Sequence, residues 1–166
     1  MFTAFLYQSM GIKLALTHQE IDRAFWNAAS PGVPSDGSER FLAFLKEQNI
    51  RTGVISNITY CGEVVEERIR NLLPNHDFEF IIATSEFLFR KPNKRIFQLA
   101  LEKAGLQPED AWYIGDNYLC DVVGARSAGI FPVWYIGASA NPQGENDALT
   151  ISHWKQLEKE ISELSG

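Results

Sequence analysis

Three groups of polar residues stand where short apolar runs end, and their side chains could hold an anion and a metal ion. The first group is Ser56 and Asn57, which directly follow Val54 and Ile55. Their hydroxyl and amide groups can donate hydrogen bonds to an anion without adding charge. Taken alone, a Ser-Asn pair is more often a turn or a helix cap than an anion site.

The second group is centred on Lys91, which stands just before a strongly patterned helix that is expected to begin at Pro92. A cation at the positive end of a helix is unfavourable unless an anion is shared between the two. Lys91 is therefore a candidate for anion binding, although a lysine in this place is commonly a solvated surface charge.

The third group follows the apolar run from Trp112 and contains Gly115, Asp116 and Asp121. A glycine lets the backbone approach a ligand closely. Two carboxylates that converge at the end of a strand suit a hard, oxygen-preferring cation such as Mg²⁺. The alternative is a helix-capping aspartate followed by a surface aspartate.

Alternating strands and helices are expected to position these residues. Strands are predicted at residues 52–56, 78–83, 111–114 and 131–136, and helices at 38–45, 63–73, 92–104, 119–128 and 152–164. Such alternation predicts a parallel sheet, in which ligands bind beyond the carboxyl ends of the strands. All three polar groups then fall at that edge.

The N-terminal residues have a different pattern. Helical spacing of apolar residues predicts helices at 2–10 and 17–28, the second opened by a Thr17–Glu20 capping box. The turn-rich stretch from Ser30 to Gly37 is the expected linker. We therefore divide the chain into a helical segment, 1–34, and an α/β core, 35–166.

Composition restricts the partners. The chain has 166 residues, a net charge of −6 and 45% hydrophobic residues, as expected of one globular domain. The negative charge argues against nucleic acid or an anionic membrane as the main partner. Two cysteines without metal-type spacing, Cys61 and Cys120, indicate free thiols and a cytoplasmic location.

The order and spacing of the three groups resemble the haloacid dehalogenase superfamily, over roughly Ser38 to Ile136. The most specific stretches are Arg90–Phe97 (RKPNKRIF) and Ile114–Gly129 (IGDNYLCDVVGARSAG). The spacing of Asp116 and Asp121 favours the Mg²⁺-dependent phosphatase branch of that superfamily.

The resemblance implies a Rossmann-like, three-layer core with a parallel sheet, preceded here by a short fragment of a helical cap. It implies that Ser56 and Asn57 bind the phosphoryl group and that Lys91 neutralises it. Asp116 and Asp121 would ligate Mg²⁺. The substrate would be a small phosphorylated metabolite.

One motif of the family does not occur in these 166 residues: Asp-x-Asp, whose first aspartate is the nucleophile and whose second protonates the leaving group. The family places it at the end of a central strand that precedes the cap. We therefore expect weak Mg²⁺ binding and no activity from this chain alone. Three explanations stay open: the chain begins inside a longer protein, residues 2–7 form a substitute strand, or a partner chain completes the sheet.

Two classes of function follow. The first is a Mg²⁺-dependent phosphatase that is truncated in this form, and the second is a catalytically dead module for phosphate or protein binding on the same fold. A further possibility is a homodimer in which a second subunit supplies the aspartates.

Overall fold

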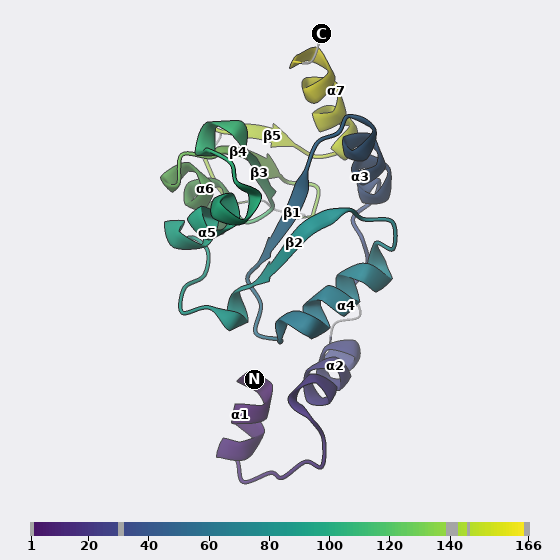
Figure 1. Cartoon of the computed structure of the whole chain (residues 1–166), viewed down its shortest axis with the longest axis vertical. Coiled ribbons are helices and arrows are strands. Elements are labelled where there is room, and N and C mark those ends of the chain that lie inside the picture. Colours follow the sequence, from purple (N-terminus) through teal and green to yellow (C-terminus); the bar gives the residue numbers. More distant parts are fainter. Residues whose placement is uncertain (1, 30–31, 139–142, 146, 165–166) are drawn as a thin grey trace.

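The computed structural model describes residues 2–29, 32–138, 143–145 and 147–164, and of residues 2–4 it describes the backbone alone. Ser30 and Pro31, at the start of the predicted linker, lie outside the described residues. Figure 1 shows an α/β body from which two N-terminal helices extend.

The elements follow the predicted alternation closely. The helices are α1 (Phe2–Ser9), α2 (His18–Ala29), α3 (Ser38–Glu47), α4 (Gly62–Leu72), α5 (Lys94–Ala104), α6 (Gly124–Ser127) and α7 (Trp154–Leu164). The strands are β1 (Thr52–Ser56), β2 (Phe78–Ala83), β3 (Trp112–Gly115), β4 (Phe131–Tyr135) and β5 (Leu149–Ile151). A π-helix (Tyr118–Val123) precedes α6, and 3₁₀ turns occupy Thr84–Glu86 and Pro108–Asp110.

Every strand pair in the described chain is parallel, as predicted. The strands form two groups, with β1 beside β2 and β4 between β3 and β5. Strand β1 has no paired neighbour other than β2 among the described residues, and β3 has none other than β4. The edges of β1 and β3 that face away from these partners therefore leave backbone groups available for pairing.

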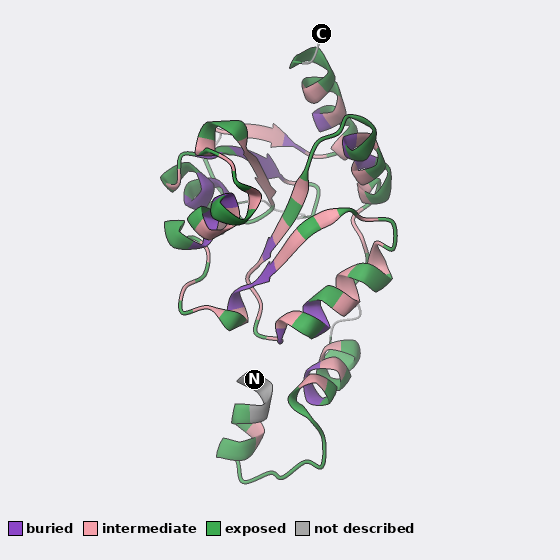
Figure 2. Cartoon of the chain, viewed as in Figure 1, coloured by how far each residue is buried: buried purple, intermediate pink, exposed green. Residues whose placement is uncertain are grey.

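Two apolar clusters hold the helices on the strands. One joins β1 and β2 to α5 and α6, around the fully buried Phe97. The other joins β4 and β5 to α3 and α7, around the fully buried Leu157. Figure 2 shows this buried interior, whereas most of the described side chains of α1 and α2 are exposed.

Residues 2–7 do not form a substitute strand, because they belong to helix α1. The main-chain N–H of Met10 donates to the carbonyl of Leu6 at 3.1 Å, and Gly11 ends the segment with a φ of 73°. Apolar residues spaced three and four apart favour this helix over the β propensity of the individual aromatic residues.

Helix α3 starts at its predicted first residue, Ser38, after a left-handed Gly37. The predicted start of α5 is wrong. Helix α5 starts after Pro92, because the side chain of Asn93 accepts a hydrogen bond from the N–H of Arg95 at 3.1 Å and so caps the helix. The capping box of Thr17 and Glu20 is confirmed by reciprocal hydrogen bonds.

Helix α2 is fastened to α4 and to the loop before it. The carboxylate of Asp22 is fully buried and accepts the main-chain N–H of Cys61 at 2.8 Å, at the N-terminus of α4. Trp26 stacks on Tyr60 with 4.5 Å between ring centres, and the guanidinium of Arg68 lies 4.4 Å from the centre of the Trp26 ring.

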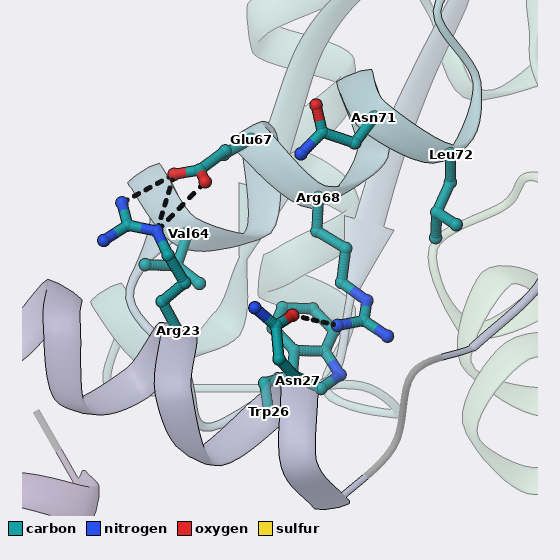
Figure 3. Close-up of a pocket in the computed structure, with 8 residues that line it drawn as sticks. All are labelled: Arg23, Trp26, Asn27, Val64, Glu67, Arg68, Asn71 and Leu72. Atoms are coloured by element: carbon teal, nitrogen blue, oxygen red, sulfur yellow. Dashed lines mark hydrogen bonds and ion pairs between the residues drawn. The ribbon is translucent and has the colours of Figure 1, made fainter.

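These contacts surround a small cavity of about 150 Å³ between the two helices (Figure 3). It is lined by residues of α2 and α4 that include Arg23 and Glu67, which form an ion pair of 2.6 Å. None of the residues predicted to bind phosphate or metal lines this cavity.

Replacing Asp22 by alanine is expected to lower the free energy of unfolding by about 2 kcal/mol, because a buried amide would lose a charged hydrogen-bond partner. Chemical denaturation followed by circular dichroism measures this loss. Asp36→Ala is the matched control, since Asp36 is exposed, and it should leave stability unchanged. Equal stability of the two variants would show that Asp22 does not fasten α2 to the core.

Candidate active site

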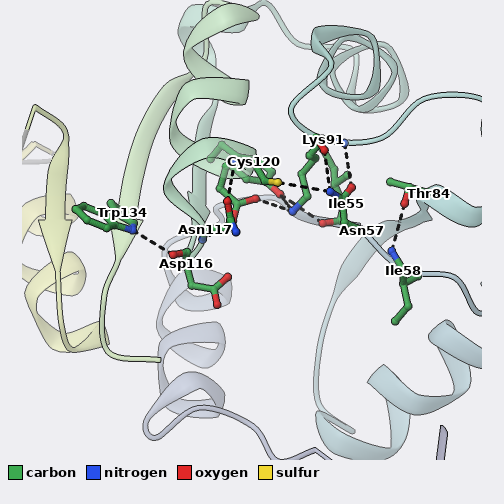
Figure 4. Close-up of polar contacts among 11 residues, drawn as sticks. Ile55, Asn57, Ile58, Thr84, Lys91, Asp116, Asn117, Cys120 and Trp134 are labelled. Atoms are coloured by element: carbon green, nitrogen blue, oxygen red, sulfur yellow. Dashed lines mark hydrogen bonds and ion pairs between the residues drawn. The ribbon is translucent and has the colours of Figure 1, made fainter. Parts of the chain in front are cut away.

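The ends of β1 and β3 and the loop before α5 bring the predicted residues together. β1 ends at Ser56 and β3 at Gly115, and Lys91 lies between β2 and α5. Figure 4 shows Asn57 and Lys91 on one side and Asp116, Asn117 and Cys120 on the other. The parallel arrangement places these strand ends at one edge, as expected for a ligand site.

An ion pair between Lys91 and Asp121 is the centre of this arrangement. Lys91 Nζ lies 2.6 Å from Asp121 Oδ1, and the two side chains are only 10% and 4% exposed. The second oxygen of Asp121 accepts the main-chain N–H of Asn117 at 2.9 Å. A buried carboxylate with partners on both oxygens is held in one orientation.

Gly115 makes this position of Asp121 possible. A Cβ on residue 115 would overlap the carboxyl carbon of Asp121. The close approach that the sequence predicted for Gly115 is therefore to a side chain of the same chain.

Asn57 fixes the loop that presents Lys91. Its Oδ1 accepts the main-chain N–H of Lys91 at 2.9 Å, and its Nδ2 donates to the Lys91 carbonyl at 2.8 Å. Nδ2 also lies 3.8 Å from Cys120 Sγ. The amide side chain of Asn57 is thus occupied by protein groups and is not free to bind an anion.

Ser56 and Asp116 stand at the strand ends without such contacts. Ser56 is half-buried, and its hydroxyl makes no hydrogen bond within the described part of the chain. Asp116 is exposed, and its main-chain carbonyl accepts the indole N–H of Trp134 at 3.1 Å. Trp134, on β4, therefore fixes the backbone that presents the Asp116 carboxylate.

The aspartates do not by themselves make a metal site. Among the described residues, no group of three or more His, Cys, Asp or Glu side chains is placed to hold a metal ion. Both carboxylate oxygens of Asp121 already have protein partners, and Asp116 lies in the exposed part of the loop. On their own, these two residues do not fit a complete Mg²⁺ site.

Sequence reasoning missed Tyr113, whose hydroxyl lies 2.8 Å from Lys91 Nζ. Alternation along β3 places Tyr113 against the cluster around Phe97, opposite its neighbours Trp112 and Ile114. A tyrosine inside a buried strand usually finds a polar partner for its hydroxyl, and that pattern could have identified it.

The fold and the site together define a parallel α/β protein with a lysine–aspartate pair at the carboxyl edge of its strands. A family profile for haloacid dehalogenase-like hydrolases matches residues 7–129. The chain therefore belongs to the haloacid dehalogenase-like hydrolase family. Within the part of the chain that the structure describes, no helix is long and apolar enough to cross a membrane.

Curated relatives include phosphatases. The chain is 32% identical over 118 residues to human haloacid dehalogenase-like hydrolase domain-containing protein 3, covering 71% of this chain and 46% of that protein. It is 34% identical over 99 residues to glyceraldehyde 3-phosphate phosphatase of Methanothermobacter thermautotrophicus, covering 58% and 42%. The chain thus spans less than half the length of these relatives.

Solved structures agree on the fold. A HAD phosphatase from Thermococcus onnurineus superposes with a TM-score of 0.70 at 23% identity, covering 95% of this chain and 69% of that one. A HAD-superfamily hydrolase from Ehrlichia chaffeensis gives 0.66 at 20% identity, covering 99% and 87%.

Proposed function

We propose that this chain supplies the phosphate-binding and charge-neutralising part of a phosphomonoesterase site for a small phosphorylated metabolite. The observation that carries the proposal is the gathering of Ser56, Lys91 and Asp121 where β1 and β3 end. In this proposal the Ser56 hydroxyl and the main-chain N–H of Asn57 bind the phosphoryl group. Lys91 neutralises its charge.

The nucleophile is proposed to be a residue outside these 166. Asp116 and Asp121 are proposed as two of the carboxylates of a Mg²⁺ site that needs a further ligand. An extended segment ending in Asp-x-Asp, paired between β1 and β3, would supply both the nucleophile and that ligand. The unpaired edges of β1 and β3 support this placement. Phosphatases among the relatives support the class of reaction.

A catalytically inactive phosphate-binding module is the second candidate. The observation that favours it is that Lys91 already has a carboxylate partner, Asp121, within this chain. The pair of Lys91 and Asp121 is therefore charge-balanced without a nucleophile.

Both candidates require that the chain binds phosphate, and titration calorimetry with inorganic phosphate tests this requirement. Ser56→Ala removes one donor and should raise the dissociation constant about threefold to tenfold. Ser127→Ala is the control, because its hydroxyl bonds to the Gly124 carbonyl rather than facing the strand ends. Unchanged affinity in Ser56→Ala, or no phosphate binding by the wild type, would contradict the proposed site.

A further inference from the structure

Tyr113 brings a neutral hydroxyl to the ammonium group of Lys91. Lys91 Nζ donates to the Tyr113 oxygen at 2.8 Å and to Asp121 Oδ1 at 2.6 Å. The same nitrogen lies 5.3 Å from the centre of the Tyr113 ring. The hydroxyl oxygen lies between the two, so Tyr113 contacts the ammonium group through its hydroxyl rather than through the face of its ring.

The ring of Tyr113 is itself fixed. It meets the fully buried Phe97 edge to face, with 4.9 Å between ring centres and 80° between the planes. At its other end the hydroxyl lies 3.4 Å from the carbonyl oxygen of Ile55 on β1. Because the Tyr113 side chain is held at its ring and at its hydroxyl, the hydroxyl occupies a defined position between β1 and β3.

The hydroxyl stays neutral over the ordinary pH range. A phenol has an ordinary pKa of about 10, so the Tyr113 hydroxyl carries no charge near neutral pH. A neutral hydroxyl accepts a hydrogen bond from the ammonium group without cancelling its charge, whereas Asp121 does cancel it. Asp121 therefore neutralises the charge of Lys91, whereas Tyr113 holds the ammonium group and leaves its charge unchanged.

We propose that Tyr113 is a positioning residue that holds the ammonium group of Lys91 toward the ends of β1 and β3. This inference rests on the proposed function of Lys91 in binding a phosphoryl group. In the absence of the Tyr113 hydroxyl, Asp121 is the one remaining hydrogen-bond partner of Lys91 Nζ among the described residues. The ammonium group would then be held by that carboxylate alone and would turn more freely.

A strand inserted between β1 and β3 is compatible with this role. Its main-chain N–H groups would compete with the Tyr113 hydroxyl for the Ile55 carbonyl. The hydrogen bond between Tyr113 and Ile55, at 3.4 Å, is longer than the 2.8 Å bond between Lys91 and Tyr113. The contact with Lys91 uses a lone pair of the Tyr113 oxygen and does not depend on that carbonyl.

Tyr113→Phe tests the inference, because it removes the hydroxyl and keeps the ring against Phe97. The matched control is Tyr118→Phe, which removes a hydroxyl bonded to Asp147 on the exposed side of the π-helix. Two quantities are measured in the full chain. The first is the exchange with water of the Lys91 ammonium protons, seen by ¹⁵N NMR without ligand and assigned with Lys91→Arg. The second is the affinity for inorganic phosphate.

In Tyr113→Phe we expect about tenfold faster ammonium exchange and a phosphate dissociation constant raised about tenfold, with Tyr118→Phe unchanged. Unchanged exchange in Tyr113→Phe, or equal effects of the two variants, would overturn the inference. If exchange accelerates but the wild type binds no phosphate, the proposed function fails while the positioning of Lys91 by Tyr113 is supported.

Discussion

Lys91→Met is expected to lower the free energy of unfolding by about 3–5 kcal/mol, because it leaves the buried carboxylate of Asp121 without its cation. The Lys91 side chain is only 10% exposed and that of Asp121 only 4%, so water cannot replace the missing partner. Urea unfolding followed by circular dichroism measures the loss. The same variant should also abolish phosphate binding, since the site loses its positive charge.

Two further variants separate this effect from a general loss of charge. Lys46→Met removes a lysine whose ion pair with Asp77 is more than half exposed, and it should have a much smaller effect. The double variant Lys91→Met/Asp121→Leu removes both buried charges and should regain stability relative to Lys91→Met. If the double variant is as unstable as the single one, the cost does not come from an unpaired carboxylate.

The unpaired edges of β1 and β3 are expected to accept a further strand. A polypeptide that carries an apolar strand ending in Asp-x-Asp ahead of this chain should therefore hydrolyse p-nitrophenyl phosphate with Mg²⁺. The physical reason is that the strand can pair with both edges and place a carboxylate near Lys91. Replacing the first aspartate of that motif by asparagine should lower turnover by about 10³-fold or more, because no covalent intermediate can form.

The matched control has the same strand with both aspartates replaced by asparagine. The added strand should raise the stability of the chain with or without its two aspartates, because backbone pairing does not need the carboxylates. Stabilisation without turnover in the parent polypeptide would favour the phosphate-binding module over the phosphatase.

Local sequence was sufficient for most of the fold. The bounds of β1 and β2 were predicted correctly, because each is a short run rich in apolar residues between turns. Strand β5 was missed, because Leu149–Ile151 is only three residues long and exists through its pairing with β4. The start of α5 was misplaced, because Pro92 and Asn93 are both typical of a helix start and the side-chain cap is at Asn93.

The site shows the same limit of sequence reasoning. Residue types predicted that Lys91, Asp116 and Asp121 belong to one edge of the sheet. The sequence did not show that Lys91 and Asp121 bind each other, nor that the Asn57 side chain is occupied by the backbone of Lys91. Such pairings depend on distances between separate elements, which spacing along the chain does not determine. The partner of the Tyr113 hydroxyl, Lys91, could not be predicted for the same reason.

The 166-residue chain is proposed to provide a phosphate site but not the nucleophile. The most direct test measures p-nitrophenyl phosphate hydrolysis by this chain with Mg²⁺. The substrate concentration is set above the dissociation constant for phosphate that calorimetry gives. We expect binding of phosphate and no turnover above that of Lys91→Met, the control for contaminating phosphatases. Turnover that is present in the 166-residue chain and lost in Lys91→Met would contradict this assignment, because a residue within these 166 would then act as the nucleophile.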